Sequence, residues 1–129
     1  MEERKLIVIL NNKLTDEQLK EIKNEFVNIK IEYLPDDLQG IWSRISAEYF
    51  RNKIHLLARQ FSFFIRQNNY EIAIIQGEIG ITYALVNLLK YTNVYCMYPC
   101  FYRGVEDIKN PDGTIKVVQI LKHAQFRRY

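Results

Sequence analysis

Short, unbroken apolar runs alternate with helical patterns along this chain, and this alternation constrains the fold more than any other feature. Leu6–Leu10 is entirely aliphatic, and residues 29–34, 71–76 and 94–98 also have the character of short buried strands. Buried strands that alternate with helices form a mainly parallel sheet, and right-handed crossovers place helices on both of its faces. The sequence therefore predicts a Rossmann-like, doubly wound α/β fold.

Three helical patterns separate the apolar runs. Thr15-Asp16-Glu17-Gln18 has the form of a capping box, which marks the start of the first helix. A long amphipathic pattern covers roughly residues 46–68, and the turn 77–80 leads into a third helix that ends near Tyr91. Residues 35–46 show no such pattern, and we expect them to be irregular.

The end of the chain reads as a β-hairpin. Asn110-Pro111-Asp112-Gly113 is a turn sequence, and the arms cover about 101–109 and 114–122. We expect this C-terminal hairpin to add antiparallel strands at the edge of the parallel sheet.

Length and composition exclude several classes of protein. A chain of 129 residues is the size of one domain, so we predict a single domain over 1–129. With 48% hydrophobic and 26% charged residues, the chain is neither disordered nor collagen-like. No apolar run approaches the ~20 residues that span a bilayer, and no leader peptide is expected. Two cysteines cannot form a disulfide framework, so we expect a cytoplasmic protein with reduced thiols.

The net charge of +3 is concentrated at the end of the chain. Residues 113–129 contain Lys116, Lys122, Arg127 and Arg128 and no acid. Such a basic stretch favours an anionic partner, and the simpler alternative is a solvated tail.

Two loops carry the residues best suited to bind a ligand. In an open α/β sheet, ligands bind beyond the carboxyl ends of the strands. Asparagine and glutamine amides offer donors and acceptors, and glycines allow the backbone to approach a phosphate. For the glycine turn the alternative is an ordinary strand-to-helix connection. The candidate ligand-binding residues after the first strand are Asn11, Asn12 and Lys13, and those after the third strand are Gln76, Gly77, Gly80 and Thr82.

The tail adds candidate catalytic residues. Lys122, His123 and Arg127 lie beside Phe126 and Tyr129, a mixture that suits phosphate contact and base stacking. An imidazole titrates near neutral pH, so His123 is a candidate acid or base, with a surface histidine as the alternative. Two histidines and two thiols form no recognisable metal-ligand pattern, so we expect no metal and no cofactor.

Four stretches in this order resemble the small single-domain CARF (CRISPR-associated Rossmann-fold) proteins found beside type III CRISPR systems. They are Asn11–Thr15, Tyr33–Ser43, Gln76–Tyr83 and Lys122–Tyr129, and the resemblance covers nearly the whole chain. In those relatives the second loop position is often histidine, where this chain has Asn12. That difference argues against a catalytic base in the first loop.

The resemblance implies a homodimer that binds a cyclic oligoadenylate across its two-fold axis. Some such proteins are ring nucleases, which degrade this messenger and switch off antiviral signalling. In them, a ribose 2′-hydroxyl attacks the adjacent phosphate without a metal. On this reading cyclic tetra-adenylate is the expected ligand, His123 and Arg127 are catalytic, and Lys122 helps to bind the ligand. We expect no contact with long nucleic acids or membranes.

Two alternatives remain open. One is a non-catalytic module that senses or sequesters the same messenger. The other is an unrelated Rossmann-like nucleotide-binding enzyme. Against it, Tyr33-Leu34 occupies the end of the second strand, where a ribose-binding acid usually lies, although Glu32 comes just before.

Overall fold

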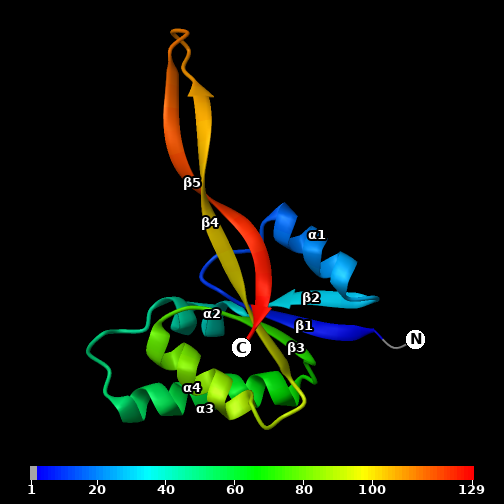
Figure 1. Cartoon of the computed structure of the whole chain (residues 1–129). Helices are drawn as coiled ribbons and strands as arrows, with labels where there is room; N and C mark the ends of the chain where they lie inside the picture. The colour runs from blue at the N-terminus through cyan, green and yellow to red at the C-terminus, as the bar shows by residue number, and fades with distance from the viewer. Residues whose placement is uncertain (1–2) are drawn as a thin grey trace.

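A computed structural model describes residues 3–129, and these residues form one mixed sheet with helices on both faces (Figure 1). The strand order is β2-β1-β3-β4-β5. The first four strands in this order pair in parallel, and β4 and β5 pair antiparallel. The predicted α/β fold, with a mainly parallel sheet and a C-terminal antiparallel pair, is therefore confirmed, and the arrangement is consistent with a Rossmann-like fold. The elements are β1 (Arg4–Ile9), α1 (Asp16–Glu25), β2 (Ile29–Tyr33), α2 (Asp36–Ser43), α3 (Arg51–Gln67), β3 (Ile72–Ile75), α4 (Ile79–Leu89), β4 (Tyr95–Lys109) and β5 (Ile115–Arg128).

Side chains that alternate along the central strands build a separate core on each face of the sheet. Ile7 and Ile9 of β1 face α2, α3 and α4, where they pack with Trp42 and Phe61. Leu6 and Val8 face α1 and pack with Ile22, among others. Burial on both faces explains why the strands read as continuous apolar runs.

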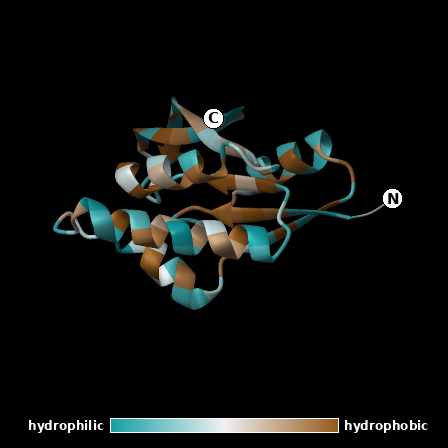
Figure 2. Ribbon diagram, turned by 90° about the horizontal axis from the view of Figure 1, so that it is seen from below, coloured by the Kyte–Doolittle hydropathy of each residue, from teal (hydrophilic) through white to brown (hydrophobic). Residues whose placement is uncertain are grey.

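The hydropathy of the strands and helices fits this layered arrangement (Figure 2). In Figure 2 the central strands are hydrophobic, whereas the helices that cover them carry both colours. Within the described residues, no helix combines the length and the apolar character needed to cross a bilayer.

The capping box predicted at residue 15 is confirmed. Thr15 is the N-cap of α1, and its hydroxyl accepts a bond from the Gln18 backbone N–H at 3.2 Å. The Gln18 side chain in turn accepts from the Thr15 N–H at 2.9 Å. This pair fixes the point at which the chain leaves the loop after β1.

The segment expected to be irregular instead contains a helix, α2. Pro35 precedes it, and Asp36 and Asp37 lie in the first turn, where negative charge is favoured. Leu38 and Trp42 are both buried, so the helix presents one apolar edge to the core. Helix α2 has only eight residues, one of them a glycine, so it is too short for its apolar periodicity to be recognised in the sequence.

Two further boundaries differ from expectation. The long helix begins at Arg51 rather than near residue 46. The fourth strand and the first arm of the hairpin are one continuous strand, β4, and β5 extends from Ile115 to Arg128. The two strands continue far beyond the body of the sheet as a twisted two-stranded arm (Figure 1).

Candidate functional site

A cleft of about 400 Å³ opens at the carboxyl ends of β1 and β3. The chain leaves β1 towards β2 on one side and returns to β3 on the other, so this is the topological switch point of the sheet. Five of the predicted ligand-binding residues lie together here, although they come from loops 65 or so positions apart in sequence. The lining residues are Leu10, Asn11, Asn12, Lys13, Thr15, Gln18, Gln76, Gly77, Pro99, Phe101 and Leu121.

Helix α2 holds both loops in place. The Gln39 amide donates to the Leu10 carbonyl oxygen at 2.8 Å and to the Ser43 hydroxyl at 3.0 Å. One turn further along, the Trp42 indole N–H donates to the Gln76 carbonyl oxygen at 3.2 Å. Sequence reasoning missed Gln39 because it lay in a segment with no recognised helix. Its spacing of three from Trp42 is the signal that could have identified it.

The cleft combines an apolar wall with amide side chains, and its one charged lining residue is cationic. Asn11, Asn12 and Gln76 are exposed and carry amides that both donate and accept hydrogen bonds. Lys13 supplies the positive charge, and its Nζ lies 5.8 Å from the centroid of the Tyr33 ring. No aspartate or glutamate is among the residues that line this cleft. The arrangement suits an anionic ligand that also has hydrogen-bonding edges.

The structure explains the glycine at position 77 by packing, whereas the sequence suggested a close approach of the backbone to a phosphate. A Cβ at this position would lie 2.6 Å from Nε1 and 2.8 Å from Cε2 of Trp42. Trp42 is 1% exposed and packs edge-to-face on Phe61, so its ring cannot move aside without disturbing the core. The glycine is therefore required for packing against α2.

The N-terminus of α4 is already capped by a carboxylate. Glu78 is the N-cap, and its side chain accepts from the Ile81 N–H at 2.9 Å. A Cβ on Gly80 would lie 3.1 Å from the same carboxylate. An anion at this helix end would have to displace Glu78, so Gly80 does not contribute to the cleft as the sequence had indicated.

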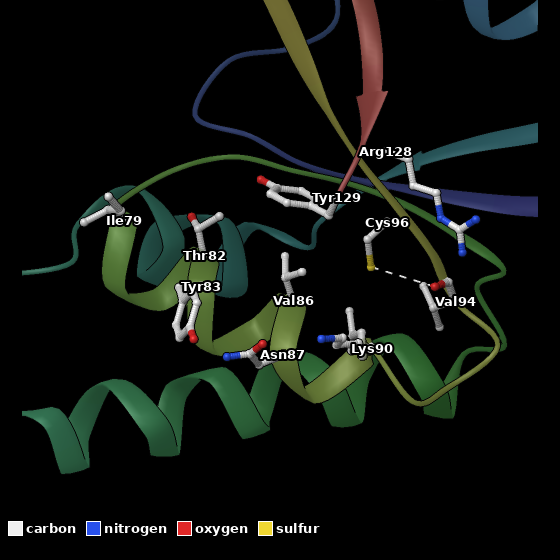
Figure 3. Close-up of a pocket in the computed structure, with 11 residues that line it drawn as sticks. Ile79, Thr82, Tyr83, Val86, Asn87, Lys90, Val94, Cys96, Arg128 and Tyr129 are labelled. Atoms are coloured by element: carbon white, nitrogen blue, oxygen red, sulfur yellow. Dashed lines mark hydrogen bonds between the residues drawn. The ribbon is translucent and has the colours of Figure 1, made fainter.

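Thr82 lies in a different depression, an apolar groove of about 430 Å³ between α4 and the end of β5. Figure 3 shows Thr82, Tyr83 and Val86 on α4 beneath the ring of Tyr129. The Tyr129 hydroxyl donates to the Ile75 carbonyl oxygen at 2.5 Å, which fixes the chain terminus beside β3. Burial raises the pKa of the Cys96 thiol in this groove to about 11.

His123 is held against α1 rather than in the cleft. Its Nε2 lies 2.8 Å from Oε1 of Glu21, and the other carboxylate oxygen accepts from the Phe126 N–H at 3.1 Å. The His123 side chain is 6% exposed, and its Nδ1 has no partner within the described residues. Its environment is that of a packed histidine that joins α1 to β5.

The two remaining tail residues also lie outside the cleft. Arg127 is exposed and donates a hydrogen bond to Tyr98, which raises the pKa of the guanidinium. Lys122 pairs with Glu106 across the arm at 3.5 Å. The structure thus brings the two strand-end loops together but does not bring the basic tail to them.

Glu32, the acid considered as the ribose ligand of a dinucleotide site, is bound to other side chains of the protein. Glu32 accepts a short hydrogen bond from the Tyr70 hydroxyl and lies 3.8 Å from Lys5 and 3.3 Å from Lys30. The bond from Tyr70, with these cations, holds the pKa of Glu32 below its usual value. Glu32 does not line the cleft. Among residues 3–129, no three His, Cys, Asp or Glu side chains are grouped so that they could hold a metal ion.

Comparison with known proteins identifies a family. Residues 4–127 match the family described as "Uncharacterized protein MJ1673 family". The chain is 31% identical over 130 residues to "Uncharacterized protein MJ1673" of Methanocaldococcus jannaschii, an alignment that covers 97% of this chain and 96% of the relative. No solved structure matches the chain.

Proposed function

Because the chain belongs to the MJ1673 family, whose description names no activity, we propose a function from the cleft itself. We propose that the protein is a CARF-like ring nuclease that binds a cyclic oligoadenylate, with cyclic tetra-adenylate as the preferred ligand, and cleaves it without a metal. The observation that carries this proposal is the acid-free group of amides and one lysine at the switch point between β1 and β3.

Binding in this proposal uses two kinds of contact. The amides of Asn11, Asn12 and Gln76 pair with adenine edges and ribose hydroxyls, since each amide offers both a donor and an acceptor. Lys13 offsets the charge of a phosphate. Phe101 and Leu121 form the apolar wall on which a base can lie.

Cleavage in this proposal is an in-line transesterification. The ribose 2′-oxygen forms a bond to the adjacent phosphorus, and the bond from phosphorus to the 5′-oxygen breaks. The proton of the 2′-hydroxyl passes to solvent, and the departing 5′-oxygen takes one from solvent. The products carry a 2′,3′-cyclic phosphate and a 5′-hydroxyl. The cleft would contribute in-line positioning, and Lys13 would stabilise the charge on the pentavalent phosphorus.

A non-catalytic sensor of the same ligand is the second candidate. It is favoured by the location of His123, which pairs with Glu21 outside the cleft, and of Arg127, which bonds to Tyr98. Lys13 is the only titratable side chain among the residues that line the cleft.

We further propose that the protein acts as a homodimer. A cyclic ligand with repeated nucleotides is enclosed most simply by the same surface repeated through a two-fold axis, an isologous arrangement. One copy offers a single set of strand-end loops within the described residues.

The test is to incubate the protein with cyclic tri-, tetra- and hexa-adenylate in the presence of chelator and to identify the products. A ring nuclease yields linear products ending in 2′,3′-cyclic phosphate, whereas a sensor binds and releases intact ligand. Lys13→Ala should slow single-turnover cleavage by roughly 10²-fold or more. His123→Ala and Arg127→Ala test the tail, because unchanged rates would exclude both as catalytic residues. If no cyclic oligoadenylate binds at all, the proposal is wrong.

A further inference from the structure

Within the described residues, the two-stranded arm pairs with no other strand, and only its base contacts the body of the protein, where His123 meets Glu21 of α1. β3 pairs with β4 only along Tyr95–Met97, so the stretches Phe101–Lys109 and Ile115–His123 pair only with each other. In Figure 1 this arm projects well away from the helices and the central sheet. Each of its outer edges therefore presents unpaired backbone N–H and C=O groups.

The side chains of the arm are more apolar than a solvated ribbon needs. An isolated two-stranded hairpin is at best marginally stable in water. Single exposed apolar residues are common, but several along both strands of one ribbon, even with charged residues between them, favour an interaction surface. The exposed apolar side chains of the arm are Phe101, Tyr102, Val105, Ile108, Ile115, Val117 and Leu121.

The charges distinguish the two free edges. β5 carries Lys116 and Lys122 in the arm and no acid, and lysines on an edge oppose pairing. β4 carries both signs on one face, with Arg103 and Asp107 placed symmetrically two residues before and after Val105. Neither Arg103 nor Asp107 has an ion-pair partner within the described residues.

We infer that the free edge of β4 pairs antiparallel with the same edge of a second copy of this chain, with the two-fold axis at Val105. This register sets Arg103 of each copy against Asp107 of the other, so two ion pairs form by symmetry. It also sets Tyr102 against Ile108, and Phe101 against Lys109. The result is a four-stranded antiparallel sheet, β5-β4-β4-β5, in place of two exposed ribbons.

Pro99 sets the inner limit of this pairing. It lies in β4 at the base of the arm, opposite Phe126, and has no N–H to donate to a neighbouring strand. A register shift in the β4–β5 pairing follows immediately, between Cys100 and Phe101. The edge available to a second copy therefore begins at Phe101.

The arm contact keeps the two clefts apart. Phe101 lines its own cleft and lies opposite Lys109 of the other copy. The Phe101 residues of the two copies are therefore eight residues apart along the paired strands, a distance of roughly 26 Å. The interface and the cleft share Phe101, but residues 103, 105 and 107, at which the interface is tested, do not line the cleft, so either proposal can fail without the other. If two copies also enclose one cyclic ligand, that contact uses a second two-fold axis, and both together give a tetramer with dihedral symmetry.

Charge reversal tests the register by sedimentation velocity without ligand. Wild type should be a dimer at micromolar concentration. Arg103→Asp sets two aspartates against each other, and Asp107→Arg sets two arginines against each other, so each should raise the dimer dissociation constant by roughly tenfold or more. The double variant Arg103→Asp/Asp107→Arg restores opposite charges and should recover most of the wild-type affinity. Lys116→Glu, on β5, makes the same change in net charge as Arg103→Asp and should have little effect.

Cross-linking tests the position of the axis. In a background with Cys96→Ala and Cys100→Ala, Val105→Cys should form a disulfide-linked dimer on mild oxidation, because the residue meets its own copy. Val117→Cys is about as exposed, at 64% against 62%, but lies on β5 away from the axis and should not. Circular dichroism confirms that each variant folds.

The inference is overturned by either of two results. One is a monomeric wild-type protein over the whole concentration range. The other is a dimer in which the double charge variant is no better than the single ones and Val105→Cys links no faster than Val117→Cys. The second result would place the dimer interface elsewhere on the molecule.

Discussion

At the scale of single residues, Gly77 shows that packing and ligand binding can each require a glycine at the same position in a sequence. A glycine after a buried strand is compatible with a close approach of phosphate and with a bulky neighbour. Only the fold brings Trp42, 35 positions away by number, onto Gly77. The residue type was informative, but its cause lay in a tertiary contact.

We predict that Gly77→Ala destabilises the protein by about 1–3 kcal/mol, because the new methyl group overlaps the indole ring of Trp42. Gly40→Ala is the matched control. Its Cβ would lie 3.9 Å from the nearest atom, on Arg44, within helix α2, so it should stabilise by roughly 0.5–1 kcal/mol. Urea unfolding measures both changes. Equal stability of Gly77→Ala and wild type would contradict the packing explanation.

The bond between Tyr70 and Glu32 gives a prediction about pH. The pKa of Glu32 is lower in the folded chain than its ordinary value of 4.5, chiefly because the Tyr70 hydroxyl donates to the carboxylate. The resulting stabilisation is complete above the unfolded pKa and is lost as the pH falls through the folded one. Tyr70→Phe should therefore cost about 1 kcal/mol at pH 7 and progressively less below pH 4.5.

Urea unfolding of wild type and Tyr70→Phe at a series of pH values measures this difference. Glu32→Gln serves as a companion variant, since it removes the charge and should flatten the pH dependence in the same range. A cost of Tyr70→Phe that is constant from pH 7 to pH 3 would show that the hydroxyl does not act through the carboxylate.

At the scale of elements, sequence and structure agree where the local signal is strong. The capping box at Thr15 and the turn at Asn110–Gly113 are each held by side chains that bond to near neighbours in sequence, so both could be predicted. Helix α2 could not, because its apolar edge is completed only by contact with the core. Missing α2 also hid Gln39, which ties the first loop to this helix.

The capping box is expected to matter for the cleft as well as for helix α1. Thr15→Ala removes the acceptor for the Gln18 N–H and should cost about 1 kcal/mol of stability. Thr15 and Gln18 both line the cleft, so affinity for cyclic tetra-adenylate should fall as well. Thr15→Ser keeps the oxygen and is the control for both measurements. If Thr15→Ala and Thr15→Ser are equally stable, the cap contributes nothing.

At the scale of the whole molecule, the mainly parallel α/β sheet could be predicted, because alternating apolar runs and helices with right-handed crossovers leave few alternatives. Parallel strands place Asn11 and Gln76 at the same edge of the sheet, and the structure brings them to one cleft. The location of the tail could not be predicted. His123 and Arg127 lie on β5, and their surroundings depend on how β5 twists along β4 past α1. Charge alone carries no information about such a path.

The most direct test of the central claim, that the cleft between β1 and β3 binds a cyclic oligoadenylate, is equilibrium binding of cyclic tetra-adenylate to three proteins. Asn12→Asp replaces a cleft amide by a carboxylate of the same shape, and Asn87→Asp makes the same change in the groove beside α4. A carboxylate repels a bound phosphate, so Asn12→Asp should bind at least tenfold more weakly than wild type. Asn87→Asp should bind within about twofold of wild type. Equal affinities for all three proteins, a loss confined to Asn87→Asp, or no binding to wild type would contradict the claim.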